Sequence, residues 1–171
     1  QYFLGHRQAF ESKFGQEPVQ AKAYQFYLRM GELATNNSEL SALQEAKRVA
    51  ASSGLRNADA LVCRIQLNWY RSKQDVPNYI ATCNELFKTP EGAADIAEKN
   101  FQALIVSRGC DKKEELRPAL KWSQDVLKVQ QDYSALRNMA LLQLKLGKIK
   151  PGMATAKKAI AAAKAEGEEY D

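Results

Sequence analysis

Apolar residues recur along this chain at intervals of three and four positions, which is the period expected when one face of an α-helix is buried. The pattern is clearest between residues 134 and 167. Two segments there each carry a mostly apolar stripe, formed by Leu136, Met139, Ala140, Gln143 and Leu144 in the first and by Met153, Ala156, Ile160 and Ala163 in the second. Gly147 and Pro151 separate the segments, because glycine favours a helix end and proline is tolerated in a first helical turn. The stretch is therefore predicted to form a helical hairpin.

Similar pairs of helical segments precede this stretch, separated by residues that break helices. Ser38, after Asn36-Asn37, is placed to cap one helix, and Asp75 is placed to cap another. Thr89-Pro90-Glu91-Gly92 marks a further break. The expected fold is all-α, with hairpins over residues 18–53, 57–88, 93–130 and 133–167. A helix within residues 1–15, closed by Gly15, is expected to act as a linker or cap for a helical domain over residues 16–171.

The third hairpin has the least regular pattern. Phe101, Leu104 and Ile105 are predicted to form the inward stripe of its first helix, and a long polar turn follows. The predicted hairpins begin roughly 37 residues apart, which suggests an internal repeat. In support, AKRVAAS at residues 46–52 resembles AKKAIAA at residues 156–162, which lies 110 residues further along the chain.

This arrangement resembles the tetratricopeptide repeat, a helical hairpin of about 34 residues with the pattern W-x2-L-G-x2-Y on its first helix and A-x3-F then P on its second. With Gly147 aligned to the glycine of the turn, the W, L, G and Y positions are taken by Leu136, Met139, Ala140 and Gln143. Gly152 and Ala156 take the A and F positions, and Lys164 stands where proline is common. The aromatic residues and the proline are thus missing. The resemblance implies a right-handed stack of about four antiparallel hairpins, an α-solenoid whose first helices line a concave surface.

Composition narrows the class of protein. The chain has 171 residues, 45% of them hydrophobic and 26% charged, which is ordinary for a globular protein. Its net charge of +5 is spread along the sequence, which favours a solvated surface over a nucleic-acid-binding face. No apolar run approaches the roughly 18 residues of a membrane span. Because the chain begins at Gln1, it is interpreted as a domain of a larger protein.

The sequence offers little that could carry catalysis. It contains no phosphate-binding glycine loop, zinc-protease motif, nucleophile elbow or calcium loop. Cys63, Cys83 and Cys110 are widely spaced and form no C-x-x-C pair, which disfavours zinc binding and dithiol redox chemistry. Cys63 and Cys83 lie on apolar helical faces and are predicted to be buried. The carboxylate groups Glu114-Glu115 and Glu166-Glu168-Glu169 are expected at solvated turns or helix ends. No catalytic residue, cofactor or metal ligand is therefore assigned, although an enzyme within a helical core stays as a minor alternative.

The leading interpretation is a non-catalytic interaction or scaffold module that binds a protein, a peptide or an attached N-terminal domain. Tyr24 and Tyr27 lie on a first helix, and Lys145 and Lys148 belong to a lysine cluster that could meet an acidic partner. These four residues are the candidate partner-binding set. A second interpretation rests on the opening YFLGHRQAFESKFG, which with the following repeats is similar to regions after a thioredoxin-fold domain in bacterial envelope proteins. That resemblance implies a periplasmic accessory domain of a thiol-disulfide oxidoreductase.

Overall fold

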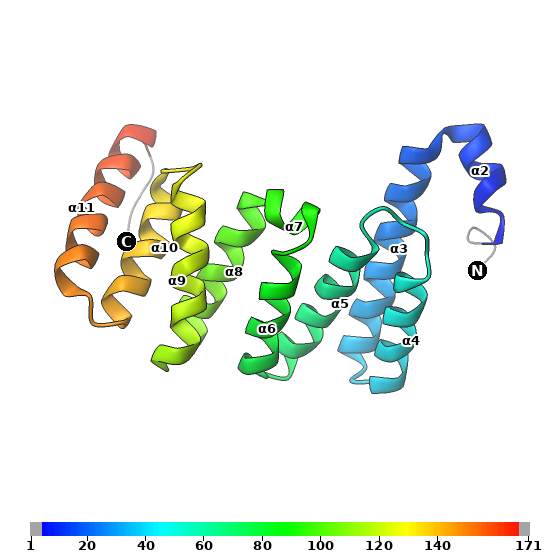
Figure 1. Ribbon diagram of the computed structural model, residues 1–171, viewed down its shortest axis with the longest axis horizontal. Coiled ribbons are helices and arrows are strands. Elements are labelled where there is room, and N and C mark those ends of the chain that lie inside the picture. The colour runs from blue at the N-terminus through cyan, green and yellow to red at the C-terminus, as the bar shows by residue number, and fades with distance from the viewer. Residues whose placement is uncertain (1–4, 168–171) are drawn as a thin grey trace. The chain divides into compact units, whose positions relative to one another are not determined.

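The computed structural model describes residues 5–167, except for the side chain of Glu166, and these residues are helical apart from their turns (Figure 1). The ten helices within this range are α2 (Arg7–Phe14), α3 (Gln16–Asn36), α4 (Leu40–Ala51), α5 (Ala58–Ser72), α6 (Val76–Leu86), α7 (Pro90–Ala94), α8 (Ile96–Gly109), α9 (Lys113–Leu127), α10 (Tyr133–Lys145) and α11 (Ile149–Glu166). The chain divides into two compact units, unit 1 up to Thr89 and unit 2 from Pro90 onward. The all-α prediction is confirmed.

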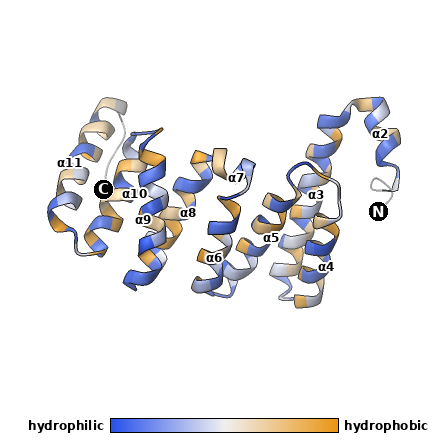
Figure 2. Cartoon of the chain, viewed as in Figure 1, coloured by the Kyte–Doolittle hydropathy of each residue, from blue (hydrophilic) through white to orange (hydrophobic). Residues whose placement is uncertain are grey.

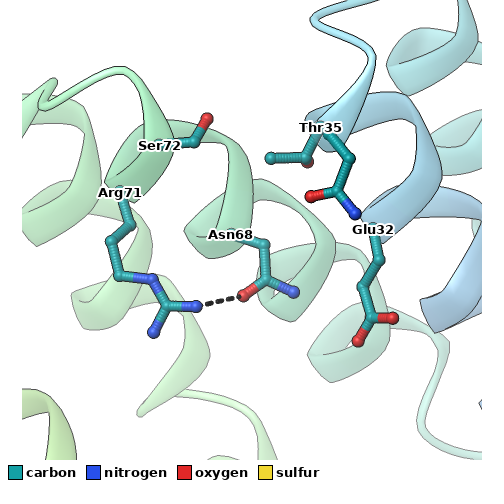
Figure 3. A pocket seen from close by; sticks show the side chains of 6 residues that line it. Glu32, Thr35, Asn68, Arg71 and Ser72 are labelled. Carbon is teal, nitrogen blue, oxygen red and sulfur yellow. Dashed lines mark hydrogen bonds between the residues drawn. The ribbon is translucent and has the colours of Figure 1, made fainter.

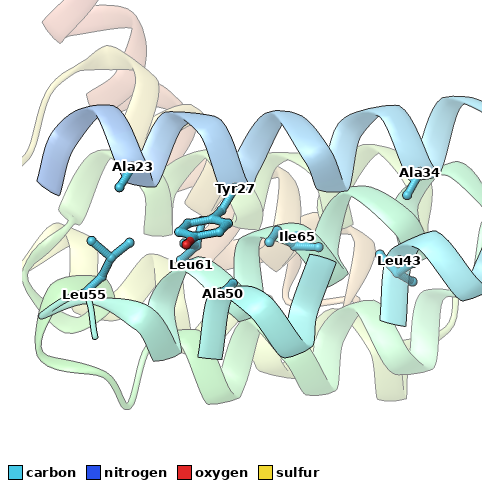
Figure 4. Packing of buried hydrophobic residues seen from close by; sticks show 8 residues of the cluster. All are labelled: Ala23, Tyr27, Ala34, Leu43, Ala50, Leu55, Leu61 and Ile65. Atoms are coloured by element: carbon cyan, nitrogen blue, oxygen red, sulfur yellow. The ribbon is translucent and has the colours of Figure 1, made fainter. Parts of the chain in front are cut away.

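Unit 1 consists of two helical hairpins and the N-terminal helix. Helix α3 pairs with α4 and α5 pairs with α6, while α5 also packs against both α3 and α4, and α2 packs on α3. The buried residues shared by α3, α4 and α5 form one apolar core, which Figure 4 shows between the helices. Its members are Ala23, Tyr27, Ala34, Leu43, Ala50, Leu55, Leu61 and Ile65.

Unit 2 repeats this scheme with α8, α9, α10 and α11. Helix α8 pairs with α9 and α10 pairs with α11, while α10 also packs against both α8 and α9. The short helix α7 precedes α8, so the predicted break at Thr89–Gly92 is itself partly helical. In both units the first helix of the second hairpin therefore contacts both helices of the first hairpin.

Three of the four hairpin turns share one backbone conformation. The residues with positive φ are Ser38 (57°), Gln74 (54°) and Gly147 (77°). In each turn, the N–H of this residue donates to the carbonyl three positions back, and the next N–H donates to the carbonyl five positions back. This pair of bonds is the Schellman motif, which satisfies the last carbonyls of a helix. Ser38 and Gln74 are 36 residues apart, and Gln74 and Gly147 are 73 residues apart, close to two such steps. The predicted repetition thus has a structural counterpart in the turns.

The caps agree with the sequence in one case and differ in another. The Asp75 carboxylate accepts a hydrogen bond from the N–H of Asn78, as predicted, and Asp95 and Asp132 cap α8 and α10 in the same way. Ser38, in contrast, does not cap α4, whose N-cap is Glu39. The reason is the turn, because Ser38 occupies its left-handed position.

Helix α11 buries only part of the predicted stripe, since Ala163 faces inward as expected but Met153 and Ile160 do not. Its buried residues are small, Gly152, Ala159 and Ala163, whereas Met153 and Ile160 are exposed. A Cβ atom at position 152 would lie 2.7 Å from Cδ2 of Leu144, so glycine lets α10 and α11 approach closely there. Close approach favours the small stripe over the large one as the inner face.

Two further expectations are corrected. Phe101 is 48% exposed, and the buried side of α8 instead includes Asn100, Ala103 and Val106. The segments at 46–52 and 156–162 are one residue out of structural register, because their preceding turns, at Ser38 and Gly147, are 109 residues apart rather than 110.

Candidate functional site

A polar cleft of about 320 Å³ opens in unit 1 between the C-terminal ends of α3 and α5 (Figure 3). Its lining comes from two successive first helices, Glu32, Thr35 and Asn36 from α3 and Asn68, Arg71 and Ser72 from α5. Each α3 residue has its counterpart in the α5 residue 36 positions later, which is also the spacing of the two turns. The cleft is thus built from the same three positions of consecutive hairpins.

The fold satisfies some of these groups internally. The Thr35 hydroxyl donates to the carbonyl of Gly31 at 2.9 Å, and the Ser72 hydroxyl donates to the carbonyl of Trp69 at 2.8 Å. Both hydroxyls keep lone pairs that can accept further bonds. Their own helices therefore fix these two side chains in position at the edge of the cleft.

The charged and amide groups keep more of their hydrogen-bonding capacity. Arg71 Nη2 donates to Asn68 Oδ1 at 3.2 Å, the dashed line in Figure 3. This is the one hydrogen bond of the Arg71 guanidinium to a described residue, and it leaves most of its five donors available. Glu32 accepts from Arg29 Nη1 at 2.9 Å on an exposed surface, where such a pair is weak. The cleft therefore presents both donors and acceptors.

The two predicted tyrosines lie elsewhere on α3. Tyr27 is only 4% exposed and belongs to the apolar core, so its ring is not available to a partner. Burial raises the pKa of the Tyr27 hydroxyl, and the nearby Arg7 cation opposes that shift. Tyr24 packs at the edge of the same core, and its hydroxyl accepts a hydrogen bond from Arg64 Nη1 at 2.7 Å. Both rings thus contribute to the packing of α3 against its neighbours.

The two predicted lysines differ from each other. Lys145 Nζ donates to the carbonyl of Cys110 and to Asp111 Oδ1, both at 2.9 Å. These bonds tie α10 to the α8–α9 turn, the one hairpin turn of the described chain that lacks a left-handed residue. Lys148 is exposed at the start of α11. Lys145 therefore has a structural role, and partner binding by Lys145 and Lys148 stays a prediction.

Cys63 and Cys83 are buried free thiols, as predicted, and Cys110 is a third. Burial raises the pKa of the Cys63 thiol, and the Glu85 and Asp59 carboxylates raise it further. Burial also raises the pKa of Cys110, with the Glu115 carboxylate adding to the effect. A raised pKa lowers the thiolate fraction at neutral pH, and the thiolate is the reactive form. Cys63 and Cys110 are therefore poorly suited to nucleophilic or redox chemistry.

Residues 5–167 offer no metal centre or membrane span. No group of three or more His, Cys, Asp or Glu residues is placed to hold a metal ion within this range. None of the described helices combines the length and the hydropathy that crossing a membrane requires. Glu114 is exposed and Glu115 is half-buried, in the first turn of α9. The other predicted carboxylate group falls outside the description, since it consists of Glu168, Glu169 and the side chain of Glu166.

None of the six cleft residues was predicted as a functional residue. A signal for them exists in the sequence, because polar residues occur at matching positions just before the breaks at residues 36–38 and 72–75. To recognise this signal, the two helices must be aligned with an offset of 36 residues, and only the turns at Ser38 and Gln74 define that offset. Comparisons with known proteins add no relative, since no family model, no curated protein and no solved structure matches the chain.

Proposed function

We propose that this protein is a non-catalytic interaction module that holds a peptide segment of a partner protein in the cleft between α3 and α5. One observation carries the proposal: equivalent positions of two consecutive hairpins converge on one polar cleft. Repeated helical hairpins present successive first helices side by side, and a peptide lying across them contacts the same position of each.

The chemistry of the lining favours a peptide over a small charged ligand. A peptide backbone offers one donor and one acceptor per residue. Asn36 and Asn68 carry both kinds of group in their side-chain amides, and Glu32 and Arg71 supply an acceptor and a donor of opposite charge. The volume of about 320 Å³ lies at the lower end of the range for ligand pockets, which suits a short stretch of chain.

The same proposal includes a more specific fold class. The hairpins are interpreted as tetratricopeptide-like repeats of a right-handed α-solenoid. The interpretation is supported by the 36-residue spacing of the first two turns and by the packing of each second hairpin on both helices of the first. The repeat length of that family is about 34 residues, and its first helices line the binding surface.

The test begins with selection of peptides from a random display library by the whole chain. A selected peptide is then titrated against Asn68→Ala and Arg71→Ala variants. Each substitution is expected to weaken binding about fivefold to tenfold, because each removes hydrogen bonds that form only with the peptide. Arg48→Ala is the matched control, since Arg48 is also exposed and bonded to a side chain three residues back, but lies on α4.

Mapping of the bound peptide by NMR chemical shifts decides the mechanism. Shifts centred on the C-terminal ends of α3 and α5 support the proposal. A footprint that avoids both helices, or a loss of affinity in Arg48→Ala equal to that in Arg71→Ala, rules it out.

A further inference from the structure

Helix α11 carries a second apolar stripe that the described residues leave exposed. Ile149, Met153 and Ile160 are 54%, 55% and 39% exposed, although each is a large hydrophobic residue. A neighbouring stripe of small residues, less than a quarter of a turn away around the helix, already packs α11 against α10. Figure 2 shows hydrophobic and hydrophilic residues alternating along this helix. Helix α11 therefore has an exposed apolar stripe in addition to its buried one.

The spacing of the outward residues is that of a coiled-coil seam. Ile149, Met153, Ala156 and Ile160 follow one another at steps of four, three and four residues. A repeat that averages 3.5 residues matches the a and d positions of a heptad, where one helix inserts side chains between those of another. Ile149 and Ala156 take the d positions, and Met153 and Ile160 take the a positions. We call these four residues the α11 seam.

A row of lysines follows the same repeat. Lys150 and Lys157 are exposed and are spaced seven residues apart, each one position after a d position of the heptad. No Asp or Glu occurs between Ile149 and Ala165. In coiled coils the residues beside the seam select the partner by charge. The α11 seam is therefore bordered by one continuous line of positive charge.

We propose that the α11 seam docks an amphipathic α-helix of another protein whose own seam is flanked by acidic residues. Apolar side chains of that helix cover Ile149, Met153 and Ile160, and its carboxylates pair with the lysine row. This surface belongs to unit 2 and does not depend on the peptide cleft of unit 1.

The lysine row also argues against a second copy of this chain as the occupant. Antiparallel pairing of two α11 seams would place the two lysine rows opposite each other, which is repulsive. Parallel pairing would place the lysines against the g positions of the partner, Gly152 and Ala159, and these are buried under the chain's own fold. An acidic helix avoids the repulsion and needs charge pairing only on the lysine side of the seam.

The experiment uses the whole chain and two synthetic helices of about four heptads, both with leucine at a and d. One peptide carries glutamate at e and g, and the other carries lysine there. Fluorescence anisotropy of the labelled peptides is expected to show binding of the glutamate peptide at least about tenfold tighter than that of the lysine peptide, with affinity falling as salt is added.

Three substitutions locate the contact. Met153→Asp is expected to weaken binding of the glutamate peptide about tenfold, because it places a charge within the seam. Lys157→Glu is expected to weaken it about threefold through loss of one exposed ion pair. Lys158→Glu is the matched control, with the same charge change one residue later, about 100° around the helix and away from the seam. Circular dichroism establishes that the variants remain folded.

Other results overturn the proposal. Equal losses in Lys157→Glu and Lys158→Glu would mean general charge attraction, and no loss in Met153→Asp would exclude the seam. Binding to anionic phospholipid vesicles without binding to the glutamate peptide would assign the surface to a membrane. Seam-dependent dimers in light scattering would assign it to a second copy. Arg71→Ala, in the cleft of unit 1, should leave binding of the glutamate peptide unchanged, which separates this test from that of the cleft.

Discussion

The two units place different chemistry at the same positions of the same helical scheme. Tyr27 in α3 and Asn100 in α8 each lie ten residues before the C-cap of their helix, and Ile65 in α5 and Asn138 in α10 each lie eight residues before theirs. Unit 1 fills these positions with an aromatic and an aliphatic side chain of one apolar core. Unit 2 fills them with two asparagines, and Asn138 Nδ2 donates to Asn100 Oδ1 at 2.7 Å.

The difference shows that the packing of one first helix on the next does not prescribe one kind of contact. An apolar contact depends on shape and volume, whereas an amide pair depends on direction and must be satisfied on burial. The Asn pair is also incomplete, because Oδ1 of the buried Asn138 has no hydrogen-bond partner among the described residues. Unit 1 therefore depends on steric fit at this helix contact, and unit 2 depends on a polar contact.

The largest expected effect tests the steric fit in unit 1. A Cβ atom at Gly31 would lie 2.7 and 2.8 Å from the two γ carbons of Ile65, which is fully buried. Gly31→Val is expected to lower the free energy of unfolding by about 3 kcal/mol, because a β-branched side chain cannot turn away within the helix. Urea unfolding followed by circular dichroism measures the loss.

Two control variants keep that test specific. Ile65→Ala combined with Gly31→Val should recover part of the loss, since it removes the atoms that the new side chain meets. Gly109→Val should cost little by comparison, because a Cβ atom at that position has no heavy atom within 4 Å. If the double variant is simply the sum of the two single losses, the Gly31–Ile65 contact does not limit the packing.

A somewhat smaller effect tests the polar contact in unit 2. Asn138→Ala removes the bonds from Asn138 Nδ2 to Asn100 Oδ1 at 2.7 Å and to the Asn100 carbonyl at 3.3 Å. The expected loss is about 2 kcal/mol, because a buried amide oxygen of Asn100 is then left unpaired. The double variant Asn100→Leu, Asn138→Leu copies the apolar solution of unit 1 and should recover at least half of that loss. A double variant less stable than Asn138→Ala would show that the two amide groups stabilise unit 2 by more than their hydrogen bonds to each other.

The sequence predicts the elements of this fold better than their buried faces. Gly147 and Asp75 carry unambiguous local signals, because a left-handed turn favours glycine and a cap requires a short acceptor. Helix α11 has apolar residues on two faces, so periodicity alone cannot decide which one meets α10. The close approach of α10 and α11 at Gly152 decides which face is buried, and periodicity within one helix does not predict such a tertiary contact.

The candidate site was still less accessible to sequence reasoning. Tyr27 was chosen as an aromatic residue on a first helix, but the volume of the unit 1 core places it inside. Asn68 and Arg71 have no motif around them, and they become a site only beside the residues 36 positions earlier in the chain. The 36-residue offset that brings them together depends on the turns at Ser38 and Gln74, and serine and glutamine do not predict a left-handed backbone.

The smallest expected effect tests whether the turns of the two units are equivalent. Gln74 holds a φ of 54° at the position where Gly147 holds 77° in the corresponding turn of unit 2. A left-handed conformation costs a residue with a side chain roughly 1 kcal/mol more than it costs glycine. Gln74→Gly is therefore expected to raise the free energy of unfolding by about 0.5 to 1 kcal/mol, the gain being reduced by the greater freedom of glycine in the unfolded chain. Gly147→Gln should lower it by a similar amount, as measured by urea unfolding of both variants beside the unchanged chain. Equal signs for the two exchanges would mean that the turns at Gln74 and Gly147 are not equivalent.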